Sequence, residues 1–131
     1  MTPAQETLRD KLKKSGDLFK EIEGLRAYIK ENEKIYDGTH DQSIKALIKS
    51  QNLKLEQDYN KLMDMRLKID KCINTLDDAE LKSILVMRYL GHINTLDIAE
   101  AMHYGRNSIN RKHKIALNKL IENGGAKYLD Y

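Results

Sequence analysis

The spacing of apolar residues along the first 76 positions limits the fold more than any other feature of this sequence. Between about residues 42 and 76, apolar side chains recur at steps of three and four, and residues 4–35 carry a row with the same spacing. Such spacing puts the side chains on one stripe of a helix and, at this length, is typical of a coiled coil. The segment YDGTHDQS between the rows reads as a turn, in which Asp41 or Ser43 is placed to cap the next helix. The first row is Leu8, Leu12, Leu18, Ile22, Leu25 and Ile29, and the second is Ile44, Ile48, Leu55, Tyr59, Leu62, Ile69, Ile73 and Leu76.

The two rows predict an antiparallel, coiled-coil-like helical hairpin over residues 1–76, about 45 to 50 Å long at 1.5 Å per residue. Ser15 and Gly16 interrupt the first row and are expected to weaken its helix. A two-helix hairpin buries one stripe per helix, which hardly offsets the backbone entropy lost on folding. We therefore expect hairpins from two or more chains to form a homo-oligomeric bundle, with Gln51 as the polar residue that sets the register. The alternative is that the hairpin packs on the C-terminal part of its own chain.

Composition favours helices and argues against several classes of function. One third of the residues are charged, and the chain has one Pro, no Trp and one Cys, which favours an all-α fold. We expect no membrane span, no signal peptide and a cytoplasmic location, because apolar runs are short. Cys72 is expected to be a small core residue. The histidines lack HExxH, CxxC, GxSxG or phosphate-loop context, so we expect no enzyme, no cofactor and no metal site.

Residues 77–123 predict a C-terminal domain of three helices, in which Gly91 ends the first and Gly105 breaks the second. A short helix, a tight turn and a longer helix is the order of a helix-turn-helix unit, which presents its second helix to the DNA major groove. Ala99 is the small residue needed where two such helices cross. Residues 124–131 are expected to form a flexible tail.

The third helix of this domain concentrates positive charge. Residues 101–121 contain five Lys or Arg, two His and no Asp or Glu, although the chain as a whole is only +3. Cations without carboxylates suit a surface that approaches phosphates, and Arg and Asn are the side chains that read guanine and adenine. The alternative is that this helix face is only exposed to solvent and binds nothing. His103 and His113 are expected to be ordinary surface histidines rather than phosphate ligands. The predicted contacts to double-stranded DNA are Arg106, Asn107, Ser108, Asn110, Arg111 and Lys114.

The run ELKSILVMRYLGHINTLDIAEAMHYGRNSINRKHKIALNKL resembles region four of bacterial sigma factors. With the preceding LRAYI and KIDKCINTLDD segments it is most similar to the sigma-region-four-like regulators of Gram-positive phages, the ArpU and RinA-type late transcription regulators. The resemblance implies that Arg106, Asn107, Asn110 and Arg111 form the DNA-contacting face. Two positions depart from the pattern: Gly105 stands where the relatives usually have a Ser cap, and Lys112 stands at a usually apolar site. We expect Lys112 to snorkel along the helix interface while Ile115 fills the missing volume.

These observations predict a sequence-specific transcriptional regulator of phage origin that binds double-stranded DNA. Its residues 1–76 would serve self-association or partner binding, and RNA polymerase is a possible partner. One alternative is an interaction protein that binds RNA polymerase or another host protein without reading DNA. Another is a DNA-packaging adaptor that resembles phage small terminase subunits.

Overall fold

The computed structural model describes residues 1–129, and every regular element among them is a helix, which confirms the all-α class. Within this part of the chain no helix combines the length and the apolar character needed to cross a membrane. The elements are α1 (Pro3–Gly38), α2 (Gln42–Ile73), α3 (Ala79–Leu85), the π-helical turn η1 (Val86–Leu90), α4 (Thr95–Met102), α5 (Arg106–Glu122) and the 3-10 helix η2 (Gly125–Leu129).

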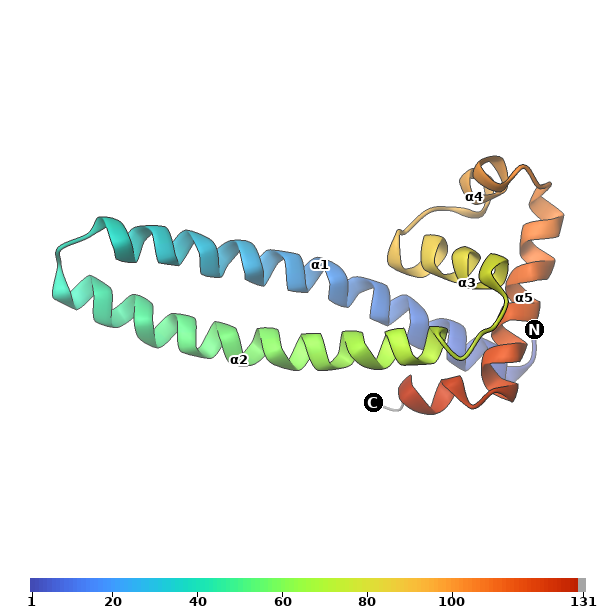
Figure 1. Cartoon of the computed structure of the whole chain (residues 1–131), viewed down its shortest axis with the longest axis horizontal. Coiled ribbons are helices and arrows are strands. Elements are labelled where there is room, and N and C mark those ends of the chain that lie inside the picture. The colour runs from blue at the N-terminus through green and yellow to red at the C-terminus, as the bar shows by residue number, and fades with distance from the viewer. Residues whose placement is uncertain (130–131) are drawn as a thin grey trace.

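The two long helices lie side by side in opposite directions, and their far halves extend away from the rest of the molecule (Figure 1). We call this projecting part, residues 25–60, the distal arm. Thr2 and Gln5 form a reciprocal capping box at the start of α1, and the Asp41 carboxylate accepts hydrogen bonds from the first backbone amides of α2. Of the two capping residues expected in the turn, Asp41 is therefore the one that acts.

A buried amide sets the register of the arm. Asn32 lies between α1 and α2 and donates from Nδ2 to Gln51 Oε1 at 3.0 Å and to Asn52 Oδ1 at 2.9 Å. Gln51 Nε2 in turn donates to the Tyr28 hydroxyl at 3.1 Å. A buried polar group is costly when it has no partner, so this network favours one alignment of the two helices over slipped ones. Gln51 thus forms its register contacts within one chain, and packing against further chains remains a prediction.

The polar gap in the first row does not interrupt α1, which runs through Ser15 and Gly16 without a break. A Cβ atom on Gly16 would lie 2.1 Å from the Tyr89 carbonyl oxygen, so only glycine permits η1 to cross α1 this closely. The His92 ring also reaches the Gly16 carbonyl oxygen, with Nε2 at 3.1 Å. The expected weak point is therefore the place where the C-terminal elements pack on α1.

One apolar core joins the base of the hairpin to the C-terminal elements, so the base packs on its own chain. The core crosses the boundary predicted at residues 76 and 77. Its buried members are Leu8, Leu12, Ile69, Cys72, Ile73, Leu76, Leu81, Leu85, Tyr89, Ala116, Leu117, Leu120 and Leu129.

The flexible tail predicted for residues 124–131 is wrong for residues 124–129. Leu129 is fully buried in the core, and η2 packs against α2. A Cβ atom on Gly125 would come within 2.6 Å of the Thr75 hydroxyl oxygen, which explains how the chain fits so closely beneath α2. Residues 130 and 131 lie outside the described residues.

Candidate nucleic-acid interface

A small apolar cluster fixes the angle between α4 and α5. Ile98, Ala99 and Ile109 are all buried and pack with Ile84 of α3. Ala99 is the smallest of them, and its size lets the two helix backbones approach each other. The small residue expected where α4 and α5 cross is therefore Ala99, as the sequence predicts.

The turn between α4 and α5 is built around a histidine instead of the expected glycine. α4 ends at Met102, and His103 takes the left-handed conformation with φ of 59°, while Tyr104 donates its backbone N–H to the Ala99 carbonyl at 2.9 Å. Gly105 has an extended backbone with φ of −74° and precedes α5 as its N-cap. The residue that breaks the helix is thus His103, two positions before the predicted one.

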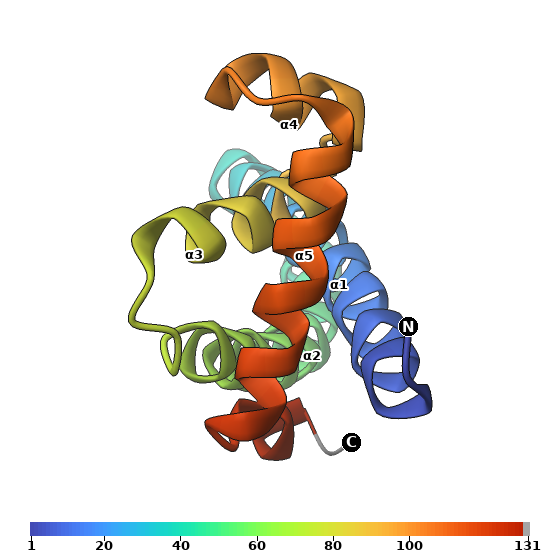
Figure 2. The same cartoon turned by 90° about the vertical axis from the view of Figure 1, so that its right-hand side faces the viewer.

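The predicted contact residues lie on the N-terminal half of α5, and all but one of them are exposed. They recur at steps of three and four, so they share one face of the helix. Ser108 is half-buried, and its hydroxyl accepts a hydrogen bond from Arg111 Nη2 at 3.4 Å. Figure 2 shows α5 running down the near side of the molecule, with the arm extending away behind it. The exposed members are Arg106, Asn107, Asn110, Arg111 and Lys114.

The electrostatics of this end of α5 favour anions. The first turn contains no acidic residue, and within the described residues no side chain caps its free backbone amides. The amide dipoles of a helix add up to a partial positive charge at its N-terminus. Arg106 and Arg111 add full charges to the same region, so the exposed half of α5 is an anion-attracting surface.

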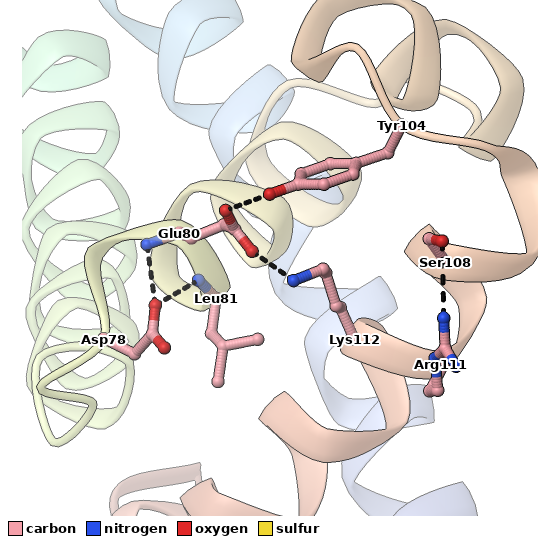
Figure 3. A network of polar contacts seen from close by, with 7 residues as sticks. All are labelled: Asp78, Glu80, Leu81, Tyr104, Ser108, Arg111 and Lys112. Atoms are coloured by element: carbon pink, nitrogen blue, oxygen red, sulfur yellow. Dashed lines mark hydrogen bonds and ion pairs between the residues drawn. The ribbon is translucent and has the colours of Figure 1, made fainter.

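Lys112 is held by a polar cluster that joins three elements (Figure 3). Its ammonium forms a salt bridge of 2.5 Å with Glu80 Oε1 in the first turn of α3, and it lies 4.8 Å from the centroid of the Tyr104 ring. The Tyr104 hydroxyl donates to the other Glu80 oxygen at 2.7 Å. The expectation that Ile115 replaces Lys112 in the interface is wrong, because Ile115 is 43% exposed. We call Glu80, Tyr104 and Lys112 the α3–α5 clamp.

The hydrogen bonds of the α3–α5 clamp keep its ion pair charged. The bond from Lys112 lowers the pKa of Glu80, and the bond from Tyr104 adds to the effect. The bond to Glu80 raises the pKa of Lys112. The sequence does not predict the contacts of Lys112 and Tyr104 with Glu80, because these residues lie 32 and 24 positions from it in the chain. The one signal was Lys112 itself, since a lysine at a usually apolar position needs a polar partner.

His113 is a core residue, and the prediction of a surface histidine is wrong. Its side chain is only 2% exposed, and Nε2 lies 2.5 Å from the Tyr89 hydroxyl. Burial lowers the pKa of His113 to about 4, and the positive charges of Arg88 and Arg9 act in the same direction. The ring is therefore neutral at pH 7 and offers no charge to a phosphate.

Neither a metal cluster nor a reactive thiol is present in the part of the chain that the structure describes. No group of three or more His, Cys, Asp or Glu side chains within residues 1–129 is placed to hold a metal ion. Cys72 is buried as predicted, and burial raises the pKa of its thiol to about 11. A thiol with that pKa stays protonated at pH 7, which makes it a poor nucleophile.

Comparison with known proteins adds a family to this geometry. A search of the curated proteins found no match, and neither did a search of the solved structures. A family model described as "Protein of unknown function (DUF1492)" matches residues 32–121, a segment that runs from the arm to the end of α5. Because the match covers more than half of the chain, the protein belongs to the DUF1492 family.

Proposed function

We propose that this protein is a sequence-specific transcriptional regulator of phage origin that binds double-stranded DNA through a helix-turn-helix unit formed by α4 and α5. The observation that carries the proposal is the exposed face of α5, where Arg and Asn side chains gather at the positive end of a helix whose opposite face is buried. An α-helix is about 10 to 12 Å across and the major groove is about 12 Å wide, so a helix presented in this way fits the groove.

The side chains on this face have the chemistry of direct readout. Arg106 and Arg111 each offer a planar fork of N–H donors that matches the O6 and N7 acceptors of guanine. Asn107 and Asn110 can pair with the N6 and N7 atoms of adenine. The hydrogen bond from Arg111 to Ser108 restrains the guanidinium before it meets DNA, which lowers the entropy that binding would remove.

The resemblance of α3, α4 and α5 to sigma-factor region four supports this proposal and suggests where such a regulator acts. Proteins of that kind bind DNA beside RNA polymerase, which makes the polymerase a candidate partner. The DUF1492 match includes most of the distal arm as well as α5, so the family joins a helical arm to the proposed DNA-binding unit.

We further propose that the distal arm mediates self-association. Three large side chains of the distal arm are exposed to solvent: Leu47 by 70%, Leu53 by 61% and Tyr28 by 49%. A bundle of two arms would cover apolar surface of this kind and would present two copies of α5 to half-sites about 34 Å apart, one turn of DNA. Analytical ultracentrifugation is expected to show a dimer or higher oligomer at micromolar concentration, and a stable monomer would contradict this part of the proposal.

The proposal is tested by nuclease-protection footprinting on the DNA of the phage or host that encodes the protein, followed by Kd measurements on a protected duplex. Arg111→Ala is expected to weaken binding by about 1 to 3 kcal/mol, or roughly 5- to 150-fold in Kd, if its guanidinium pairs with one base. As a control, Lys68→Ala removes one positive charge from an exposed position of α2 outside the distal arm and should leave Kd nearly unchanged. Equal affinities for all three proteins would refute the assignment of α5.

The exposed arm also favours a second candidate, an interaction protein that binds RNA polymerase without reading DNA. The two functions separate in footprints made with and without polymerase. Protection by the protein alone supports direct DNA recognition. Protection that needs polymerase and survives Arg111→Ala supports the interaction protein.

A further inference from the structure

A pocket of about 350 Å³ opens where α1, η1 and the start of α4 meet. The described residues that line it include two cations, Lys13 and Arg88, and no carboxylate. An adjoining hollow of about 290 Å³ shares both cations and adds the carboxylate of Asp17. The complete lining of the first pocket is Lys13, Arg88, Tyr89, His92, Ile93, Asn94 and Thr95.

Arg88 is fixed in the wall of this pocket. Its Nη1 donates to the Thr95 hydroxyl at 2.8 Å, and its guanidinium carbon lies 5.9 Å from the centroid of the Tyr89 ring. A guanidinium carries five N–H donors, and these two neighbours engage only part of them. Lys13 on α1 is exposed and brings a second, mobile charge. A rigid fork with a flexible ammonium beside it is a combination suited to a phosphate group.

The two cations of the pocket lie near the charged half of α5. α1 packs against both η1 and α5, which brings Lys13 to the side of the proposed recognition helix. The charges of Arg88, Lys114 and Lys13 all act on the buried His113 ring to lower its pKa, so cations of three elements gather around that point. Asp17 faces this group from the adjoining hollow and Asp10 acts on the neighbouring Tyr89. The cations Arg9, Arg88, Lys114 and Lys13 outnumber these two carboxylates.

We propose that Lys13 and Arg88 bind a backbone phosphate of DNA when α5 enters the major groove. The inference rests on the proposed DNA-binding function and extends the interface to the first helix of the hairpin. Because α5 nearly fills a groove about 12 Å wide, elements that flank it come close to the phosphates that border the groove. α1 and η1 flank α5 on one side, and their cations meet one of the two DNA strands there.

The test measures the salt dependence of binding to a fluorescein-labelled 30-base-pair duplex that contains a site protected in the footprints, by anisotropy from 50 to 300 mM KCl. Each phosphate contact contributes a slope of about −0.9 to log K against log salt. Lys13→Gln is expected to make the slope less steep by about 0.9 and to weaken binding about eightfold at 0.1 M KCl. The control is Lys68→Gln, at an exposed lysine of α2 that lies outside the distal arm and lines neither hollow, and it should leave both quantities unchanged.

The outcomes separate this inference from the function on which it rests. If the unaltered protein binds no duplex, the proposed function fails. If Arg111→Ala weakens binding while Lys13→Gln behaves like Lys68→Gln, DNA binding stands and the phosphate contact is overturned. A thermal-shift titration with inorganic phosphate distinguishes the remaining source of the ligand. Stabilisation by 10 mM phosphate that is lost in Lys13→Gln, with no change in the DNA slope, would assign the pocket to free phosphate and overturn the contact with DNA.

Discussion

At the scale of single residues, Lys112 is the position whose environment differs most from its expected role. Its ammonium is held between the carboxylate of Glu80 and the ring of Tyr104, so the α3–α5 clamp ties the first turn of α3 to the proposed recognition helix. We expect the interaction between Lys112 and Glu80 to be favourable and to weaken in salt, because both side chains are partly exposed.

A double-mutant cycle with Lys112→Met and Glu80→Gln, followed by urea denaturation at pH 7, measures this interaction. The coupling should favour the native state at 50 mM NaCl and shrink at 1 M NaCl. Since the bonds from Lys112 and Tyr104 lower the pKa of Glu80, the contribution should be present above the usual pKa range of a carboxyl group and be lost as the pH falls through the lowered value. Strictly additive effects of the two substitutions would show that the pair of Lys112 and Glu80 contributes nothing.

His113 predicts a pH dependence of a different kind. Its pKa is about 4 in the folded protein and near the ordinary 6.5 once unfolded, so the unfolded chain binds more protons between these values. Stability should therefore be complete above about pH 6.5 and should decline toward pH 4, by up to about 3 kcal/mol for a fully buried ring. The measurement is the free energy of unfolding against pH. His113→Leu should flatten this part of the profile, whereas His103→Gln, at an exposed histidine, should not.

Individual positions on α5 differ in how well the sequence could place them. The exposed face follows from helical periodicity, and five of the six predicted contact residues are exposed, with Ser108 half-buried. His113 was misplaced although it lies four residues after Ile109 and three before Ala116, on the buried stripe. The prediction followed the usual surface location of histidines, whereas the helical spacing of residue 113 correctly indicated a buried position. The partners of Lys112 lie in other elements, which no local pattern reveals.

At the scale of elements, two glycines of α1 provide a matched pair. A Cβ atom on Gly16 would clash with the Tyr89 carbonyl at 2.1 Å, whereas one on Gly24 would have no other described atom within 4 Å. Gly16→Ala is expected to lower the free energy of unfolding by about 1 to 3 kcal/mol, because η1 must move away from α1 to make room for the methyl group. Gly24→Ala should stabilise it by about 0.5 to 1 kcal/mol through helix propensity. Thermal denaturation of the two variants checks both signs, and a stable Gly16→Ala protein would show that η1 does not cross α1 this closely.

The long helices were predictable because their apolar spacing is repeated many times, so single exceptions do not change the prediction. The short elements depend on few residues and on contacts across the chain. η1 is a π-helical turn in which the Gly91 N–H donates to the Val86 carbonyl oxygen. η2 is held against α2 by the burial of Leu129 in the core. Neither arrangement has a periodic signal, and both were missed for that reason.

At the scale of the whole molecule, the shared core predicts that the C-terminal part does not fold alone. A fragment of residues 77–131 would lose the core side chains contributed by α1 and α2, including Leu12 and Ile69, and would expose Leu117 and Leu120. We expect this fragment to lack a cooperative thermal transition when followed by circular dichroism.

The matched control shortens the arm without touching the core. Joint deletion of residues 26–32 and 52–58 removes two helical turns from each long helix and preserves the base of the hairpin. This variant should still melt cooperatively. A sharp transition in the isolated fragment would instead establish the C-terminal part as an independent domain.

The length of α2 has a further consequence for any partner that binds at the turn between α1 and α2. Its 32 residues span about 48 Å at 1.5 Å per residue, a distance equal to about fourteen base pairs of DNA. Because the buried Asn32 opposes sliding of α1 and α2 past each other, we expect the whole hairpin to keep this length. If α5 binds DNA as proposed, the hairpin would place such a partner farther from α5 than the length of one full turn of the duplex.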